Sequence, residues 1–206
     1  MPRMKIFNTL EQATFDTPPV FNSTERKQFF ALPLILQDAM AGLRTPTNKV
    51  CFLAAVGYFK ARRKFFARNV NSADIDYIAR QLNLSIADVD VTSYTKFACI
   101  HHQRIILDYF GCRPFDAKTM AFAKSEIAML APVQYQPKQI LIEIIQILSR
   151  EKIEVPSYNV LADLIITAIS QHKHTLSNII HHGLNETQRS KLDALLEKEN
   201  DNTTTE

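Results

Sequence analysis

Hydrophobic and polar positions recur along this chain at the spacing of α-helices, with start and stop residues between the periodic segments. Asn22 stands three residues before Glu25, as in a capping box, and Thr45-Pro46 is a second start signal. Gly111 closes a long helix that begins near Tyr94. These signals predict helices over residues 22–32, 33–42, 46–68, 72–82, 94–110, 116–130, 137–148, 157–182 and 186–199. The pattern therefore predicts an all-α fold.

The sequence Ile78–Ser85 has the cadence of a helix-turn-helix. Ala79 is small where two helices would cross, and Asn83 is able to adopt the left-handed turn conformation. Before this segment, residues 1–22 read as an arm in which Pro18 and Pro19 break any regular element. The N-terminal part is therefore predicted to hold one or two helix-turn-helix-like units.

Pro132 and Pro137 mark a joint between two parts of the chain. The nearly continuous apolar run Ile140–Leu148 fits either a strand or a helix, and Pro137 at its start favours a buried helix. We predict a helix-turn-helix-like DNA-binding domain over residues 1–131, a small helical bundle or connector over 132–199, and a disordered polar tail over 200–206.

Composition excludes several classes of protein. Only 4 of 206 residues are Gly, which argues against Gly-rich phosphate-binding loops. The 3 cysteines, Cys51, Cys99 and Cys112, form neither a disulfide framework nor a zinc pattern, and reduced thiols suit a cytoplasmic protein. No apolar segment is long enough to cross a membrane. The histidines lack partners at metal-ligand spacing, and no catalytic motif occurs, so we expect neither a metal, nor a cofactor, nor an enzyme.

The net charge of +3 hides an uneven distribution of charge. Residues 39–73 contain no acid but hold the following cations: Arg44, Lys49, Lys60, Arg62, Arg63, Lys64 and Arg68. On a continuous helix, Lys60, Arg63, Lys64 and Arg68 fall on one face. Such a face suits a polyanion, because phosphate contacts release counterions. The alternative is a solvated helix face without a partner.

The helix predicted over 94–110 is a second candidate surface, at the position of a recognition helix. It carries side chains able to bond base edges: Thr95, Lys96, His101, His102, Gln103 and Arg104. Ile100, Ile105, Ile106 and Phe110 are expected to face the core. An ordinary amphipathic helix with a polar outer face is the alternative.

Several ordered motifs of this chain resemble the N-terminus of Tn-three-family (class II, replicative) transposases. They begin with Met1–Ile6 and Pro19–Ser23, and continue with Leu43–Asn48, Gly57–Lys60 and Arg63–Arg68. Further matches are Ile78–Leu82, His102–Arg104, Tyr109–Gly111 and Arg113–Phe115, with Pro156-Ser157 and Gln188-Arg189 further along.

The resemblance implies a module that binds the terminal inverted repeats of a transposon, as double-stranded DNA, in the bacterial cytoplasm on the nucleoid. The family's catalytic carboxylates lie on a downstream domain that this chain lacks, so DNA cleavage is not expected. DNA binding is carried over to the matching stretches 58–68 and 102–113. Together with the charge pattern, this gives the predicted contact residues: Arg44, Lys49, Lys60, Arg62, Arg63, Lys64, Arg68, Thr95, Lys96, His102, Gln103, Arg104 and Arg113.

A rival hypothesis is a role in protein interaction. A short transposase fragment could self-associate, or pair with full-length transposase and inhibit it, through the apolar surfaces of Ile140–Leu148 and Leu161–Ile180. A decayed transposase remnant is a third possibility.

Overall fold

In the computed structural model, residues 5–134, 136–191 and 194 are described, and these residues form helices and loops without a β-strand. The all-α class is thus confirmed. The elements, in chain order, are α1 (Thr9–Asp16), α2 (Ser23–Phe29), η1 (Leu34–Leu36), α3 (Gln37–Ala41), α4 (Pro46–Arg62), α5 (Ser72–Gln81), η2 (Ile86–Asp88), η3 (Val91–Ser93), α6 (Lys96–Phe110), α7 (Ala117–Leu130), α8 (Pro137–Arg150) and α9 (Tyr158–Gly183). Residues 186–191 are also helical.

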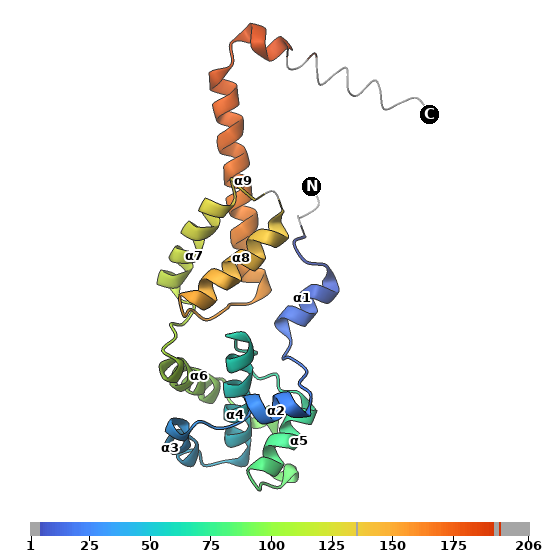
Figure 1. The fold of residues 1–206 in the computed structure, drawn as a ribbon, viewed down its shortest axis with the longest axis vertical. Helices are drawn as coiled ribbons and strands as arrows, with labels where there is room; N and C mark the ends of the chain where they lie inside the picture. The colour runs from blue at the N-terminus through green and yellow to red at the C-terminus, as the bar shows by residue number, and fades with distance from the viewer. Residues whose placement is uncertain (1–4, 135, 192–193, 195–206) are drawn as a thin grey trace, which may run out of the picture.

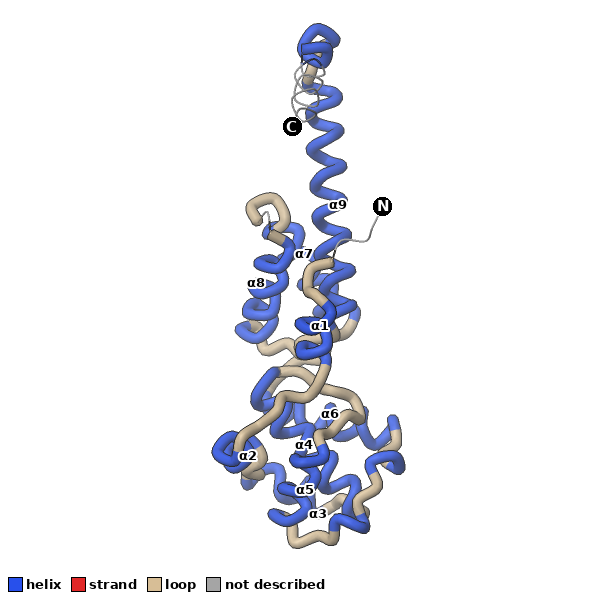
Figure 2. Tube along the Cα trace, turned by 90° about the vertical axis from the view of Figure 1, so that its right-hand side faces the viewer, coloured by secondary structure: helices blue, strands red, loops and turns tan. Residues whose placement is uncertain are grey.

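The helices form two lobes along the long axis of the molecule. One lobe holds α2 to α6, and the other holds α7, α8 and the first half of α9 with α1 beside them (Figure 1). The second half of α9 projects from the lobe, as the view in Figure 2 also shows. The predicted tail 200–206 lies outside the described residues.

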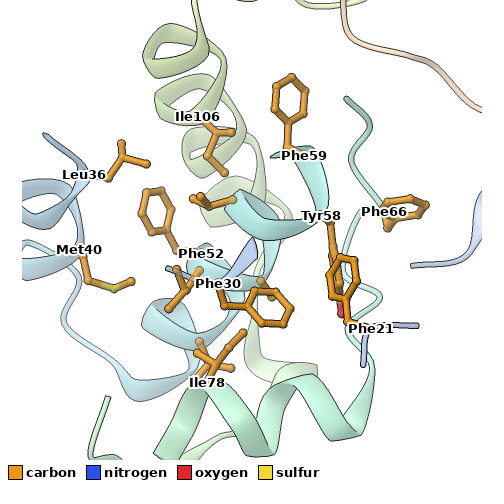
Figure 3. Close-up of a cluster of buried hydrophobic side chains, with 14 of the residues drawn as sticks. Phe21, Phe30, Leu36, Met40, Phe52, Tyr58, Phe59, Phe66, Ile78 and Ile106 are labelled. Carbon is orange, nitrogen blue, oxygen red and sulfur yellow. The ribbon is translucent and has the colours of Figure 1, made fainter. Parts of the chain in front are cut away.

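The first lobe is built around α4, which is buried on nearly every side. Phe52 and Phe59 of α4 are fully buried in one cluster with Phe30, Ile78 of α5 and Ile106 of α6 (Figure 3). Gly57 allows close approach, because a Cβ at this position would lie 2.4 Å from Phe30 Cδ1. The apolar first half of the predicted helix is therefore the hydrophobic centre of this lobe.

The second lobe has a separate hydrophobic core. Ile127 of α7, Ile140 and Ile144 of α8, and Leu161 and Ile165 of α9 are fully buried in it. The apolar run Ile140–Leu148 is helical, as predicted. Since α7 belongs to this core, the side-chain packing does not follow the predicted division at residue 132.

Local sequence signals position several helix ends. The side chains of Asn22, Thr45 and Asp116 cap α2, α4 and α7, as their positions before those helices predict. Gly111 ends α6 with φ 59°, and Asn83 has φ 53° after α5. The starts of α2, α4 and α7 are therefore encoded locally.

The arm, by contrast, contains a helix that the sequence analysis did not predict. Asn8 and Glu11 form a reciprocal capping box at the start of α1. Phe7 stacks on Tyr158 of α9, with ring centroids 5.3 Å apart, and Tyr158 Oη accepts a hydrogen bond from Phe7 N. The prediction that no regular element occurs in residues 1–22 is wrong, because α1 is stabilised by packing on the second lobe.

The long basic helix predicted over residues 46–68 is also wrong in its second half. α4 ends at Arg62, and Arg63 adopts the left-handed conformation with φ 53°. The Arg63 carbonyl accepts a hydrogen bond from Val155 N at 2.8 Å, so the chain turns here to meet the second lobe. Lys60, Arg63, Lys64 and Arg68 therefore do not share a helix face.

The helix-turn-helix remains a prediction. Residues 82–95, which include η2 and η3, separate α5 from α6, whereas a helix-turn-helix is joined by a turn of about 3–4 residues. Both α5 and α6 pack against α4.

Candidate nucleic-acid interface

Lys64, a predicted phosphate contact, is buried between the lobes. Only 5% of the residue is exposed, and its Nζ lies 2.6 Å from Asp16 Oδ1 and 3.0 Å from the Pro156 carbonyl oxygen. Burial lowers the pKa of Lys64, and the hydrogen bond and charge of Asp16 oppose that shift. The prediction that Lys64 faces a duplex is wrong, because Lys64 forms a buried ion pair with Asp16, which is distant in the sequence.

Arg63 and Arg113 also take part in the joint between the lobes. The Arg63 guanidinium lies 5.2 Å from the centre of the Phe110 ring, and its Nη1 lies 3.8 Å from Cys112 Sγ. Arg113 Nη2 donates to the Glu151 carbonyl oxygen at 3.2 Å, and its backbone pairs with Lys152 and Glu154. Arg113 and the backbone carbonyl of Arg63 connect the two lobes, whereas the Arg63 guanidinium contacts residues of the first lobe.

Two further predicted contact residues, Lys60 and Arg62, lie near the end of α4. Lys60 is exposed, and its Nζ donates to the Gln28 carbonyl oxygen at 2.8 Å, in the last turn of α2. Arg62 is exposed and, with Arg63, lines a cleft of about 980 Å³ between α1, the end of α4 and α8.

His102 is the second predicted contact residue that is buried. It is 2% exposed, its Nδ1 lies 2.8 Å from Tyr94 Oη, and its ring meets the Phe52 ring edge-on at 5.2 Å. Burial lowers the pKa of His102 from 6.5 to about 4, so the imidazole is neutral at pH 7. The prediction that His102 reads DNA is wrong, because this face of α6 packs on α4.

The buried His102 makes the stability of the protein depend on pH. Its pKa is lower in the folded state than in the unfolded state, so the unfolded chain binds more protons between pH 6.5 and 4. Stability is expected to fall on acidification through this range, by about 2 kcal/mol at pH 5 from this group alone. Urea unfolding of His102→Gln at pH 7 and pH 5 is expected to show a smaller difference than wild type, and the exposed neighbour variant His101→Gln serves as control. Equal differences in all three proteins would contradict this role of His102.

The outward side of α6 carries a mixed basic and apolar surface. Lys96, His101 and Arg104 are exposed there, together with Phe97, which is 82% exposed, and Ile100, which is 54% exposed. The expectation that Ile100 faces the core is wrong. Gln103 is half-buried at the edge, where its Nε2 lies 3.5 Å from Cys99 Sγ.

Local structure fixes the direction in which this side of α6 points. Thr95 is the N-cap, and its hydroxyl oxygen accepts a hydrogen bond from Ala98 N at 3.1 Å. Cys99, His102 and Ile106 are buried on the opposite side. Thr95 thus positions the first turn, while its side-chain oxygen is engaged by the helix itself.

Arg68 lies beside the first turns of α6. Cys99 Sγ donates to the Ala67 carbonyl oxygen at 3.6 Å, which holds the loop after α4 against α6. Burial raises the pKa of Cys99, and the nearby positive charge of Arg68 opposes this shift. We define the α6 face as Lys96, Phe97, Ile100, His101 and Arg104, all of which are exposed. Arg68 is also exposed, beside the Cys99 edge of the helix.

Arg44 and Lys49 lie at the same end of the lobe as the start of α6. Thr47 Oγ1 accepts a hydrogen bond from Asp90 N at 3.0 Å, and Cys51 of α4 packs with Tyr94 and Cys99. The beginnings of α4 and α6 are therefore neighbours. Arg44 is exposed and Lys49 is half-buried, so this end of the lobe carries two further cations.

The sequence analysis did not predict that Phe97 is an exposed surface residue, although the sequence contains a signal for its exposure. Phe97, His101, Arg104 and Asp108 are spaced by four, three and four residues, which places them on one stripe of a helix. A phenylalanine in an otherwise polar stripe indicates an exposed aromatic side chain.

Over the part of the chain that the structure describes, three or more His, Cys, Asp or Glu side chains nowhere gather in a group able to hold a metal ion. Among the same residues, every helix is too short or too polar to span a membrane.

The described residues form a two-lobed, all-helical protein. A comparison with known families shows to which family it belongs. Residues 6–168 match the family described as Domain of unknown function (DUF4158), and the chain belongs to this family. The match spans both lobes and the whole α6 face. A comparison with curated proteins found no match.

Proposed function

We propose that this chain binds double-stranded DNA through the α6 face, as the non-catalytic N-terminal part of a transposase. The observation that carries the proposal is the exposed surface of Lys96 and Arg104 on a helix whose opposite side is buried, with Arg68 exposed beside the first turns of that helix. Membership of a family found in Tn-three-family transposases supports the same role. The DNA would be the terminal inverted repeats, and the place of action the bacterial nucleoid in the cytoplasm.

In the proposed complex, the first turns of α6 enter the major groove. Lys96, Arg104 and Arg68 contact phosphates or base edges, and Arg44 and Lys49 extend the contact along the backbone. Gln103 lies at the edge of this surface and is able to reach a base after leaving Cys99. The cations of the joint, Arg63, Lys64 and Arg113, have structural partners and take no part.

A titration of duplex DNA at several salt concentrations tests the proposal. If Arg68, Lys96 and Arg104 each neutralise one phosphate, the logarithm of the binding constant is expected to fall with the logarithm of salt concentration with a slope of about −2.7. If the chain binds neither inverted-repeat duplexes nor unrelated duplexes at low salt, the proposal is contradicted.

The exposed half of α9 favours a second candidate function, self-association. Leu176, Ile179 and Ile180 are 44%, 62% and 53% exposed on the projecting part of the helix. Ile165, Ile169, His172, Leu176, Ile179 and Gly183 repeat at alternating spacings of four and three, as in a coiled coil. A stable dimer in size-exclusion chromatography that Leu176→Glu dissociates, without DNA binding, would favour this candidate over the first.

A further inference from the structure

Two large apolar side chains lie in the middle of the α6 face, although folding does not require them there. Phe97 is 82% exposed in the first turn of α6, and Ile100 is 54% exposed one turn later. The packing of α6 on α4 is made by the opposite side of the helix, through Cys99, His102 and Ile106. The exposure of Phe97 and Ile100 is therefore a property of the outer surface.

The surroundings of these side chains indicate the chemistry of a partner. Lys96 and Arg104 lie on the same side of α6 as Phe97 and Ile100, and Arg68 is exposed in the loop that packs on the Cys99 edge of the helix. A partner that covers this surface has to supply anionic groups around an apolar centre. The major groove of DNA supplies both, because phosphates line it and each thymine presents a C5-methyl group there.

The dimensions agree with such a contact. Residues 97 and 100 are separated by a rise of about 4.5 Å along the helix. Neighbouring bases on one strand are separated by about 3.4 Å. Phe97 and Ile100 are therefore able to meet neighbouring base steps from the same helix.

The acidic groups near this surface restrict which part of α6 enters the groove. Asp108 lies on the same side of α6, about 16 Å further along the helix from Phe97. Asp90 precedes the helix, and its carboxylate accepts hydrogen bonds from Thr92 N and Thr92 Oγ1. The first three turns of α6, through Arg104, therefore carry the contact, with Asp108 outside it.

We infer that Phe97, with Ile100 beside it, packs against thymine methyl groups in the major groove and gives the chain a preference for thymine-containing sites. This inference rests on the proposed function, because it names the group that the α6 face recognises. Neither side chain is charged, so the contact adds sequence preference without adding to the salt dependence of binding.

Removal of the methyl groups from the DNA tests the inference. The probe is a duplex that the wild-type chain selects from a random library of short duplexes, prepared once with thymidine and once with deoxyuridine throughout. Wild type is expected to bind the deoxyuridine duplex more weakly, by about four-fold for each methyl group that Phe97 or Ile100 buries. Phe97→Ala is expected to bind the thymidine duplex more weakly than wild type, and to discriminate less between the two duplexes.

Two further variants separate the contact from an effect on folding. Phe97→Leu keeps an apolar side chain and is expected to retain part of the discrimination, while Ile100→Ala is expected to lose a smaller part than Phe97→Ala. All three variants are expected to unfold at the wild-type temperature, because residues 97 and 100 are exposed.

The possible outcomes distinguish this inference from the proposed function. If wild type binds both duplexes with equal affinity, or if Phe97→Ala discriminates as strongly as wild type, the inference is overturned while DNA binding stands. If wild type binds no duplex, the proposed function fails and the inference fails with it.

Discussion

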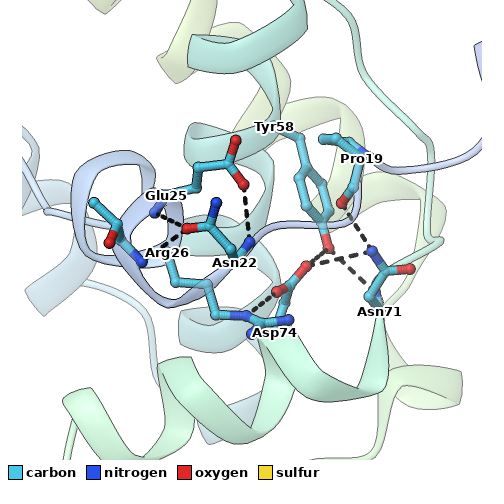
Figure 4. Close-up of polar contacts among 8 residues, drawn as sticks. Pro19, Asn22, Glu25, Arg26, Tyr58, Asn71 and Asp74 are labelled. Carbon is cyan, nitrogen blue, oxygen red and sulfur yellow. Dashed lines mark hydrogen bonds and ion pairs between the residues drawn. The ribbon is translucent and has the colours of Figure 1, made fainter.

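Replacement of Asp74 by Ala is expected to lower the free energy of unfolding by about 3–5 kcal/mol. Asp74 is fully buried in α5, where its Oδ1 lies 2.7 Å from Arg26 Nε and its Oδ2 lies 2.7 Å from Tyr58 Oη (Figure 4). Burial is the main reason that the pKa of Tyr58 is raised, so the phenol stays protonated and donates to the carboxylate. Without this carboxylate, a half-buried guanidinium and a buried hydroxyl lose their partner.

The size of this effect follows from the number of segments that meet at Asp74. Tyr58 Oη also accepts a hydrogen bond from Asn71 N, and Asn71 Nδ2 donates to the Pro19 carbonyl oxygen at 3.0 Å. The group thus connects α2, α4, α5 and the segment that leads from the arm. Asp74→Asn keeps one acceptor oxygen and is expected to cost less than Asp74→Ala.

Guanidinium unfolding followed by circular dichroism measures this effect. Asp88→Ala removes an exposed aspartate from the same lobe and is expected to change the free energy of unfolding by about 0.5 kcal/mol or less. If Asp74→Ala and Asp88→Ala prove equally stable, the buried ion pair has no role in holding the lobe together.

The second large effect is expected at Asp16, which connects the arm to both lobes. Asp16 Oδ1 lies 2.6 Å from Lys64 Nζ and 3.1 Å from Tyr158 N, the first residue of α9. Asp16→Ala leaves a buried ammonium with the Pro156 carbonyl and the Phe15 ring, and is expected to lower the free energy of unfolding by about 3 kcal/mol.

A double-mutant cycle separates the ion pair from the helix contact of Asp16. Lys64→Met removes the charge and keeps a side chain of similar length, so the double variant Asp16→Ala/Lys64→Met is expected to be more stable than Asp16→Ala alone. Additive losses in the two single variants would contradict a coupled pair and leave only the contact of Asp16 with α9.

Those parts of the fold that depend on local interactions were predictable from the sequence. Asn22, Thr45, Asp116 and Gly111 act on backbone groups within a few residues, and their roles as caps and stops are confirmed. The capping box of Asn8 and Glu11 has the same form as that of Asn22 and Glu25, and it starts α1 well before Pro18 and Pro19 interrupt the chain.

The candidate site was less predictable, because distant residues determine which cations are free. α4 ends at Arg62 where Val155 binds the Arg63 carbonyl, and Lys64 is buried by Asp16 and Pro156. His102 is buried and Ile100 is exposed, which is the reverse of the prediction. The packing of α6 against α4 determines which side of α6 faces the core. The charge pattern indicates which residues are able to bind DNA, and tertiary contacts determine which of these residues are exposed.

The central claim is that the α6 face binds DNA, and a matched pair of charge reversals tests it most directly. Lys96→Glu/Arg104→Glu changes two exposed cations of α6, and Lys118→Glu/Lys124→Glu makes the same change in charge on exposed residues of α7. Hydrogen bonds to charged groups contribute about 1.5 kcal/mol or more each, so the α6 variant is expected to lose about 100-fold in affinity for duplex DNA. Its salt slope is expected to become shallower by about 1.8.

Fluorescence anisotropy with a labelled duplex, over a range of salt concentrations, measures the affinity and the slope of both variants together. The account predicts that the α7 variant binds within a few-fold of wild type, while the α6 variant loses both affinity and salt dependence. Equal losses in the two variants, or a larger loss in the α7 variant, would contradict it.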